Sequence, residues 1–255
     1  MPPLDTVILG DNVTTMREFS DACIDLVVTS PPYDNLRTYG GHTWDFNGVA
    51  TELTRVLKPG GVIVWVVGDA TVKGSETLTS MRQAIHFKDA CGLNVHDTMI
   101  YASDKPPLTH NRYEQCWEYM FIFSKGRPKT WNPVLRKADN PGGKSGKFVQ
   151  RRDGGFEAAH TDTRTPENVL ERNIWSYTTG HERNGHPAVY PLALARDHIL
   201  SWSNPGDVVL DPFAGSGTTC VASRENARHY VGIEVNLTYV EICNRRLGIA
   251  ALNPT

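Results

Sequence analysis

Residues 207–219 read D-V-V-L-D-P-F-A-G-S-G-T-T, and this stretch predicts the fold. Its short apolar run is typical of a strand that is buried on both faces of a parallel sheet. The run ends near Asp211, and glycines at 215 and 217 leave room for a ligand to approach the backbone. A helix then begins, and its N-terminal amides would face that ligand. The alternative is a helix cap with a tight turn.

The same alternation of strands and helices continues in both directions along the chain. It predicts a three-layer, Rossmann-like α/β fold with a mostly parallel sheet. Residues 94–101 and 118–124 are expected to be antiparallel strands at one side of that sheet. The expected strands are 7–10, 24–29, 61–68, 94–101, 118–124, 207–213 and 229–234, and the expected helices are 12–19, 51–57, 76–91, 191–202, 217–226 and 236–247.

The length of 255 residues fits one large domain with an insertion. Residues 125–180 are rich in glycine, proline and charge, and their periodicity is weak. We therefore expect a core of two halves, residues 1–124 and 181–255, separated by an inserted recognition region at 125–180.

The charge is unevenly distributed, because residues 125–152 carry +8 in a chain whose net charge is −2. Such a segment is typical of a polyanion partner. The alternative is a solvated, partly disordered loop, and both hold if the loop orders on nucleic acid. The predicted DNA contacts are Lys125, Lys129, Arg136, Lys137, Lys144, Lys147, Arg151 and Arg152.

Other classes of protein receive no support from the sequence. No apolar run approaches the roughly 18 residues of a membrane span, and no signal peptide is apparent, so we expect a cytoplasmic location. The five cysteines are scattered and form no C-x-x-C pair, which argues against a disulfide framework and a structural zinc. We expect no metal site.

The strand-turn-helix unit indicates a nucleoside-containing cofactor. Glu234 ends the next strand and is placed to accept both hydroxyls of a ribose. No basic residue lies between 211 and 223 to meet a pyrophosphate, and Asp211 would suit a cationic ligand such as S-adenosylmethionine. Asp11 follows the first strand, where it could bind the adenine amino group or cap the next helix.

A second notable stretch is T-S-P-P-Y, residues 29–33, which directly follows the expected strand 24–29. Its prolines forbid further strand pairing and stiffen the chain. On its own the stretch could be a strand-ending turn with a surface aromatic residue. We call residues 30–33 the elbow.

Together these motifs make the sequence resemble the DNA amino-methyltransferases, which methylate exocyclic nitrogens of bases. T-S-P-P-Y and D-P-F-A-G-S-G-T carry the resemblance, which covers most of the chain except 125–180, and their order resembles the beta class of the family. G-H-P-A-V-Y-P at 185–191 is similar to the family's H-P-T-x-x-P element, with Ala188 where threonine is more common. The implied cofactor contacts are Asp11, Asp211, Phe213, Ala214, Gly215, Ser216, Gly217, Thr218, Glu234, His186 and Pro187.

The resemblance implies a site-specific enzyme that moves a methyl group from S-adenosylmethionine to a flipped-out base of double-stranded DNA. The Ser30 hydroxyl and the Pro31 carbonyl would bind the hydrogens of the target amino group, Pro32 would stiffen the elbow, and Tyr33 would stack on the base. None of the cysteines lies in a Pro-Cys dipeptide, which argues against carbon-5 cytosine methylation.

Several questions stay open at this point. S-P-P-Y is more frequent with cytosine N4 in the family, which favours that target, and adenine N6 is the alternative. The same core could act on RNA or on a protein glutamine, and a non-catalytic binding module is a third hypothesis. Relatives of this class belong to restriction-modification systems and often form homodimers, so we expect a homodimer.

Overall fold

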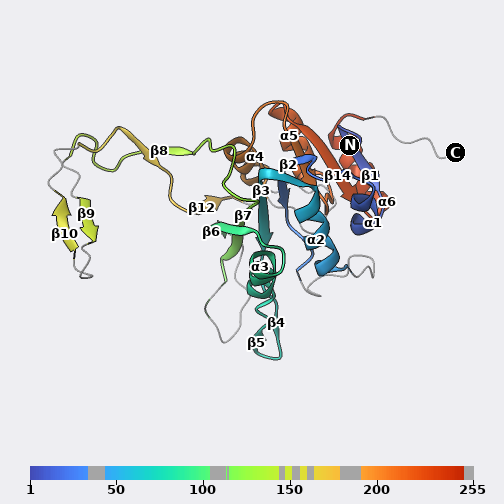
Figure 1. The fold of residues 1–255 in the computed structure, drawn as a ribbon, viewed down its shortest axis with the longest axis horizontal. Coiled ribbons are helices and arrows are strands. Elements are labelled where there is room, and N and C mark those ends of the chain that lie inside the picture. The colour runs from blue at the N-terminus through green and yellow to red at the C-terminus, as the bar shows by residue number, and fades with distance from the viewer. Residues whose placement is uncertain are drawn as a thin grey trace. The chain divides into compact units, whose positions relative to one another are not determined.

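The computed structural model describes residues 1–33, 44–103, 113, 115–143, 147–150, 156–159, 164–178 and 191–249 (Figure 1). The chain forms two compact units. The core unit comprises Met1–Asn132 and Asn173–Thr255, and the second unit comprises Pro133–Arg172. The second unit therefore lies inside the expected recognition region, whose two ends belong to the core unit.

The core unit contains an eight-stranded sheet. Within it β7 runs antiparallel to both of its neighbours, and the other neighbouring strands pair in parallel. The prediction of a mostly parallel sheet with an antiparallel pair at one side is confirmed. In spatial order the strands are β1 (Thr6–Leu9), β14 (His229–Glu234), β13 (Val208–Asp211), β2 (Ile24–Thr29), β3 (Leu57–Val67), β7 (Trp117–Ser124), β6 (Asn94–Ser103) and β12 (Ile174–Tyr177).

Helices cover both faces of this sheet, which confirms the three-layer prediction (Figure 1). Successive residues of a strand point to opposite faces, so Val27 joins one hydrophobic cluster while Leu26 and Val28 join the other. The first face packs against α1 (Asn12–Arg17), α2 (Phe46–Val56) and α3 (Thr79–Asp89). The second packs against α4 (Leu192–Trp202), α5 (Thr218–Glu225) and α6 (Leu237–Arg246).

Two predictions about local structure were wrong. Helix α2 begins at Phe46, earlier than expected, because burial of Val49 and Ala50 outweighs the weak helix propensity around Gly48. The K-P-G-G stretch at 58–61 does not separate helix from strand, since β3 begins at Leu57 and passes through it. The backbone amide of Gly60 donates to the carbonyl of Lys125 at 2.7 Å, so this stretch is held by the chain that follows β7.

Short strands occur in the region that the sequence left without structure. The strand β12 joins the core sheet beside β6, and its I-W-S-Y sequence alternates between apolar and polar residues only weakly. Within the second unit β8 (Leu135–Lys137) pairs with β11 (Asn168–Leu170), and β9 (Lys147–Gln150) pairs with β10 (Phe156–Ala159), both antiparallel. The core unit also has a small hairpin of β4 (Thr71–Val72) and β5 (Ser75–Glu76). Among the described residues, no helix is long and apolar enough to span a bilayer.

Candidate functional site

The residues singled out by the sequence lie where parallel strands end. Strand β2 leads into the elbow, β13 ends at Asp211, and β14 ends at Glu234. Because β2, β13 and β14 are neighbours in one sheet and run in parallel, these three ends meet at the same edge. Open α/β sheets place their ligands at this carboxyl edge.

A buried hydrogen bond joins the elbow's strand to the loop after β13, residues 212–217, here called the cofactor loop. The Thr29 hydroxyl donates to Oδ1 of Asp211 at 2.6 Å, across 182 residues of sequence. Both side chains are buried, and Oδ1 of Asp211 also accepts the amide of Phe213 at 3.0 Å. The strand that leads into the elbow and the start of the cofactor loop are therefore neighbours.

Burial makes the Asp211 carboxyl a weaker acid than usual, because it raises the pKa. Desolvation is the main cause that raises its pKa from 3.8 to about 6, and the charge of Glu234 adds to it. The hydrogen bond from Thr29 opposes this rise but does not cancel it. No cation among the described residues contributes to this pKa, and a cation beside the carboxylate would stabilise its ionised form.

The cofactor loop is fixed from two sides. Oε2 of Glu234 accepts the amide of Gly215 at 2.9 Å, so the acid that ends β14 also holds the loop. From α6, the Arg246 guanidinium donates to the Ser216 carbonyl at 2.7 Å and to the Thr218 hydroxyl at 3.3 Å. Gly217 has a φ of 83°, and a Cβ there would overlap Sγ of Cys243, so the turn into α5 requires glycine.

The start of α1 adjoins the same edge. Oδ1 of Asp11 accepts a hydrogen bond from the amide of Thr14 at 2.8 Å, so Asp11 caps α1, as one of the two interpretations predicted. Asn12 is buried, and its amide group donates to the Pro212 carbonyl at 3.3 Å. That contact places Asp11 next to the cofactor loop, where its second oxygen can accept a further donor.

The elbow carries a short chain of hydrogen bonds. Ser30 Oγ lies 2.8 Å from the Tyr33 hydroxyl, which donates to Oε2 of Glu118 at 2.8 Å. Glu118 is the second residue of β7, whose antiparallel direction brings its first residues to the carboxyl end of β3. The Tyr33 ring is partly buried and packs against the hydrophobic cluster on the sheet face that α1, α2 and α3 cover.

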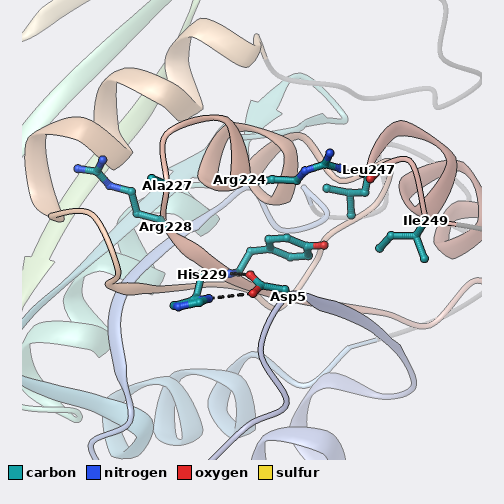
Figure 2. A pocket seen from close by; sticks show the side chains of 8 residues that line it. Asp5, Arg224, Ala227, Arg228, His229, Leu247 and Ile249 are labelled. Carbon is teal, nitrogen blue, oxygen red and sulfur yellow. Dashed lines mark hydrogen bonds and ion pairs between the residues drawn. The ribbon is translucent and has the colours of Figure 1, made fainter.

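A depression at another place in the core unit does not involve these residues (Figure 2). It is lined by Asp5, Tyr230 and the start of β14, and Nδ1 of His229 lies 2.8 Å from Oδ2 of Asp5. Asp5 precedes β1 and His229 opens β14, so this depression lies at the amino edge of the sheet, opposite to the elbow.

Comparison with known proteins places the chain. The sequence profile of the N6/N4 DNA methylase family matches residues 24–245. This chain belongs to the DNA methylase family. The orphan methyltransferase M.BamHII of Bacillus amyloliquefaciens is 48% identical over 245 residues, which cover 91% of this chain and 92% of that protein.

Two solved structures share the fold of this methylase. The PvuII DNA methyltransferase, described as cytosine-N4-specific, has a TM-score of 0.69 at 19% identity and covers 94% of this chain and 85% of its own. M1.HpyAVI, solved as a complex with S-adenosylmethionine, has a TM-score of 0.65 at 24% identity, with 96% and 99% covered. S-adenosylmethionine is the methyl donor of the family.

The cofactor residues of the methylase fit that donor. Asp211 offers a buried carboxylate whose pKa is raised by burial, and S-adenosylmethionine carries an amine and a sulfonium. The Glu234 oxygens accept the amides of Gly215 and Asn236, both at 2.9 Å, and a carboxylate oxygen can accept more than one donor, as a ribose hydroxyl would require. His186 and Pro187 lie outside the described residues.

Three of the predicted DNA-binding side chains, those of Lys125, Arg136 and Lys137, already have partners within the methylase. Nζ of Lys125 donates to the carbonyls of Thr54 and Leu57 at 2.8 and 2.9 Å, where it caps the end of α2. In the second unit Arg136 pairs with Asp139 at 3.1 Å, and Lys137 pairs with Glu167 at 3.8 Å. Lys129 is exposed. Lys144, Arg151 and Arg152, and the side chain of Lys147, lie outside the described residues.

Sequence reasoning missed four residues of this edge: Thr29, Asn12, Glu118 and Arg246. Thr29 and Glu118 had a local signal, because each is a polar residue near one end of a mostly apolar strand. Asn12 and Arg246 had none, since their contacts depend on how α1 and α6 pack beside the cofactor loop.

Proposed function

We propose that this DNA methylase transfers a methyl group from S-adenosylmethionine to N4 of a flipped-out cytosine in double-stranded DNA, at a specific sequence. The bond between Thr29 and Asp211 carries the proposal, because it ties the elbow to the cofactor loop. Ser30 at the first elbow position favours cytosine over adenine, by the resemblance to S-P-P-Y enzymes. Adenine N6 is the alternative, because both bases present a similar planar amino group.

The elbow residues would act on the amino group. Its lone pair is delocalised into the ring, so two acceptors that bind its hydrogens favour a reactive nitrogen. Ser30 Oγ and the Pro31 carbonyl are the two acceptors, held by the stiffness of Pro31 and Pro32. The Tyr33 ring provides a face for the flipped base.

When bound, S-adenosylmethionine would supply a methyl group on a positively charged sulfur. The sulfur would keep the carbon-sulfur electron pair as the nitrogen-carbon bond formed, and the nitrogen would lose one proton to water. The chain's own part is to hold both partners. Asp211 and Glu234 would bind the cationic and ribose portions, with Asp11 at the adenine edge. The cysteines take no part in this scheme.

The test is expression of the chain in cells that lack base methylation, followed by sequencing that distinguishes 4-methylcytosine from 6-methyladenine. We expect 4-methylcytosine at a single recognition sequence. Appearance of 6-methyladenine instead would overturn the choice of base, and absence of both marks from DNA would overturn the activity. The homodimer and the cytoplasmic location stay predictions, and light scattering at micromolar concentration tests the first.

A further inference from the structure

We infer that Glu118 is a positioning residue for methyl transfer, because it fixes the direction of the hydrogen-bond chain that runs from Ser30 through Tyr33. In that direction the Ser30 oxygen presents lone pairs to the target amino group. This inference rests on the proposed role of the elbow, and it adds a residue outside the elbow motif.

The direction follows from counting protons. Tyr33 has a single hydroxyl proton, and its hydroxyl donates to Oε2 of Glu118 at 2.8 Å. An ionised carboxylate can only accept, so this bond has one possible direction. The contact between Ser30 Oγ and the Tyr33 hydroxyl, also 2.8 Å, then needs the proton of Ser30.

The consequence falls on the Ser30 oxygen. With its only proton directed to Tyr33, Ser30 has lone pairs left, and it meets N–H groups of the base as an acceptor. Without Glu118 the Tyr33 hydroxyl can donate to Ser30 instead. The serine proton then turns toward the amino group, where a donor meets a donor, and the acceptor that localises the nitrogen lone pair is lost.

The surroundings keep this chain in place. A Cβ on Gly68, at the end of β3, would lie 3.4 Å from the ring carbons of Tyr33 and 3.6 Å from Cγ of Glu118. Both side chains therefore pack against the same backbone position. The pairing of Val67 with Tyr119 sets the register that brings Glu118 there. The hydrogen bond with Tyr33 explains why an acid, Glu118, directly precedes the apolar run Y-M-F-I-F.

The experiment compares Glu118→Met and Glu118→Gln in two backgrounds, wild type and Ser30→Ala. Methyl transfer from tritium-labelled S-adenosylmethionine to unmethylated phage DNA gives kcat and KM, and thermal unfolding checks the fold. Methionine keeps the size of the side chain and removes the acceptor. Glutamine keeps one acceptor but adds a donor, so it permits both directions. Glu225→Gln, at the exposed end of α5, is the matched control.

We expect Glu118→Met to lower kcat about 10- to 100-fold, the effect of losing a charged hydrogen bond, with S-adenosylmethionine affinity unchanged. Glu118→Gln should fall between it and wild type, and Glu225→Gln should match wild type. In the Ser30→Ala background, Glu118→Met should change kcat by less than about twofold, since Glu118 acts through Ser30.

Two results overturn the inference. One is a wild-type kcat in Glu118→Met, and the other is an equal loss in both backgrounds, which would mean that Glu118 only supports the fold. A failure of the proposed function would appear separately, as 6-methyladenine or as unmethylated DNA in the sequencing test, and a failure of the elbow's proposed role looks different again. In that case Ser30→Ala and Tyr33→Ala themselves would turn over at the wild-type rate.

Discussion

Different interactions stabilise the carboxyl edge of the core sheet and the second unit, Pro133–Arg172, each within itself. At the edge, buried hydrogen bonds connect segments that are distant in sequence, such as Thr29 with Asp211. In the second unit the described ion pairs are partly or largely exposed, and Asp139, whose side chain is 76% exposed, pairs with both Arg136 and Arg172. Exposed pairs contribute about 0–1 kcal/mol each, and buried polar bonds are costly to break. We therefore expect the proposed reaction site to be formed before DNA binds, whereas the charges of the second unit can exchange partners.

Acidic residues of the second unit offset part of the positive charge of the basic segment, residues 125–152. Residues 125–152 carry +8, but the second unit as a whole has eight basic and six acidic residues, a net charge of +2. Glu167 and Glu171, which flank β11, face Lys137 and Arg136 of β8. Folding therefore places acids beside part of the positive run. Phosphates would have to replace those acids as partners.

The largest effect should follow from Tyr33→Ala, which removes the stacking face of the elbow. Stacking of a base on an aromatic ring is worth roughly 1–3 kcal/mol, so we expect turnover to fall by about 5- to 150-fold, measured by labelled-methyl transfer. Cofactor affinity should stay near wild type. Tyr33→Trp keeps a face and should keep measurable activity. A folded Tyr33→Ala with wild-type turnover would show that the elbow is only a turn.

The substitution Asp211→Asn should raise the free energy of unfolding at neutral pH. Asp211 has a folded pKa of about 6 against 3.8, so its contribution to stability is complete below pH 3.8 and is lost as pH rises through 6. At neutral pH the ionised carboxyl should cost about 3 kcal/mol, and Asn avoids that cost while keeping an acceptor for Thr29. Urea unfolding of both proteins without cofactor, from pH 4 to 7.5, gives the difference.

The difference in unfolding free energy between wild type and Asp211→Asn separates the contribution of Asp211 from those of other titratable groups. Burial lowers the pKa of His198 to about 3, which makes stability fall as pH drops below its usual value of 6.5, but this term is the same in both. Asp89→Asn, which removes an exposed carboxyl at the end of α3, should give a curve parallel to wild type. A pH-independent gap between wild type and Asp211→Asn would contradict the burial argument.

Glu234→Ala should weaken cofactor binding by roughly 1.5–3 kcal/mol, the scale of hydrogen bonds to charged groups. Part of the loss would come from the released amide of Gly215. Glu234→Gln can still accept that amide, so calorimetry on both variants separates the loop from the ribose. Unchanged affinity for S-adenosylmethionine in Glu234→Ala would refute the placement.

The sequence predicted the strand ends and turns of the edge better than the contacts that surround them. Motifs such as D-P-F-A-G-S-G and S-P-P-Y are local, because a strand end and the turn after it are set by neighbouring residues. The strand β12 was missed because only four residues, Ile174–Tyr177, carry its pattern. Arg246 and Asn12 could not be assigned, since their partners lie on other segments and only packing brings them together.

The smallest expected effect concerns the second unit: reversal of Lys144 and Lys147 to glutamate. If both contact phosphates, DNA binding should weaken and the slope of log affinity against log salt should flatten by about 2, since each phosphate contact contributes roughly 0.9. Cofactor affinity should not change, because the described contacts of the carboxyl edge come from other residues. Reversal of Lys125 is a contrasting variant, since its ammonium already caps α2 and its loss should lower stability. An unchanged salt slope for the double variant would remove these two lysines from the DNA interface.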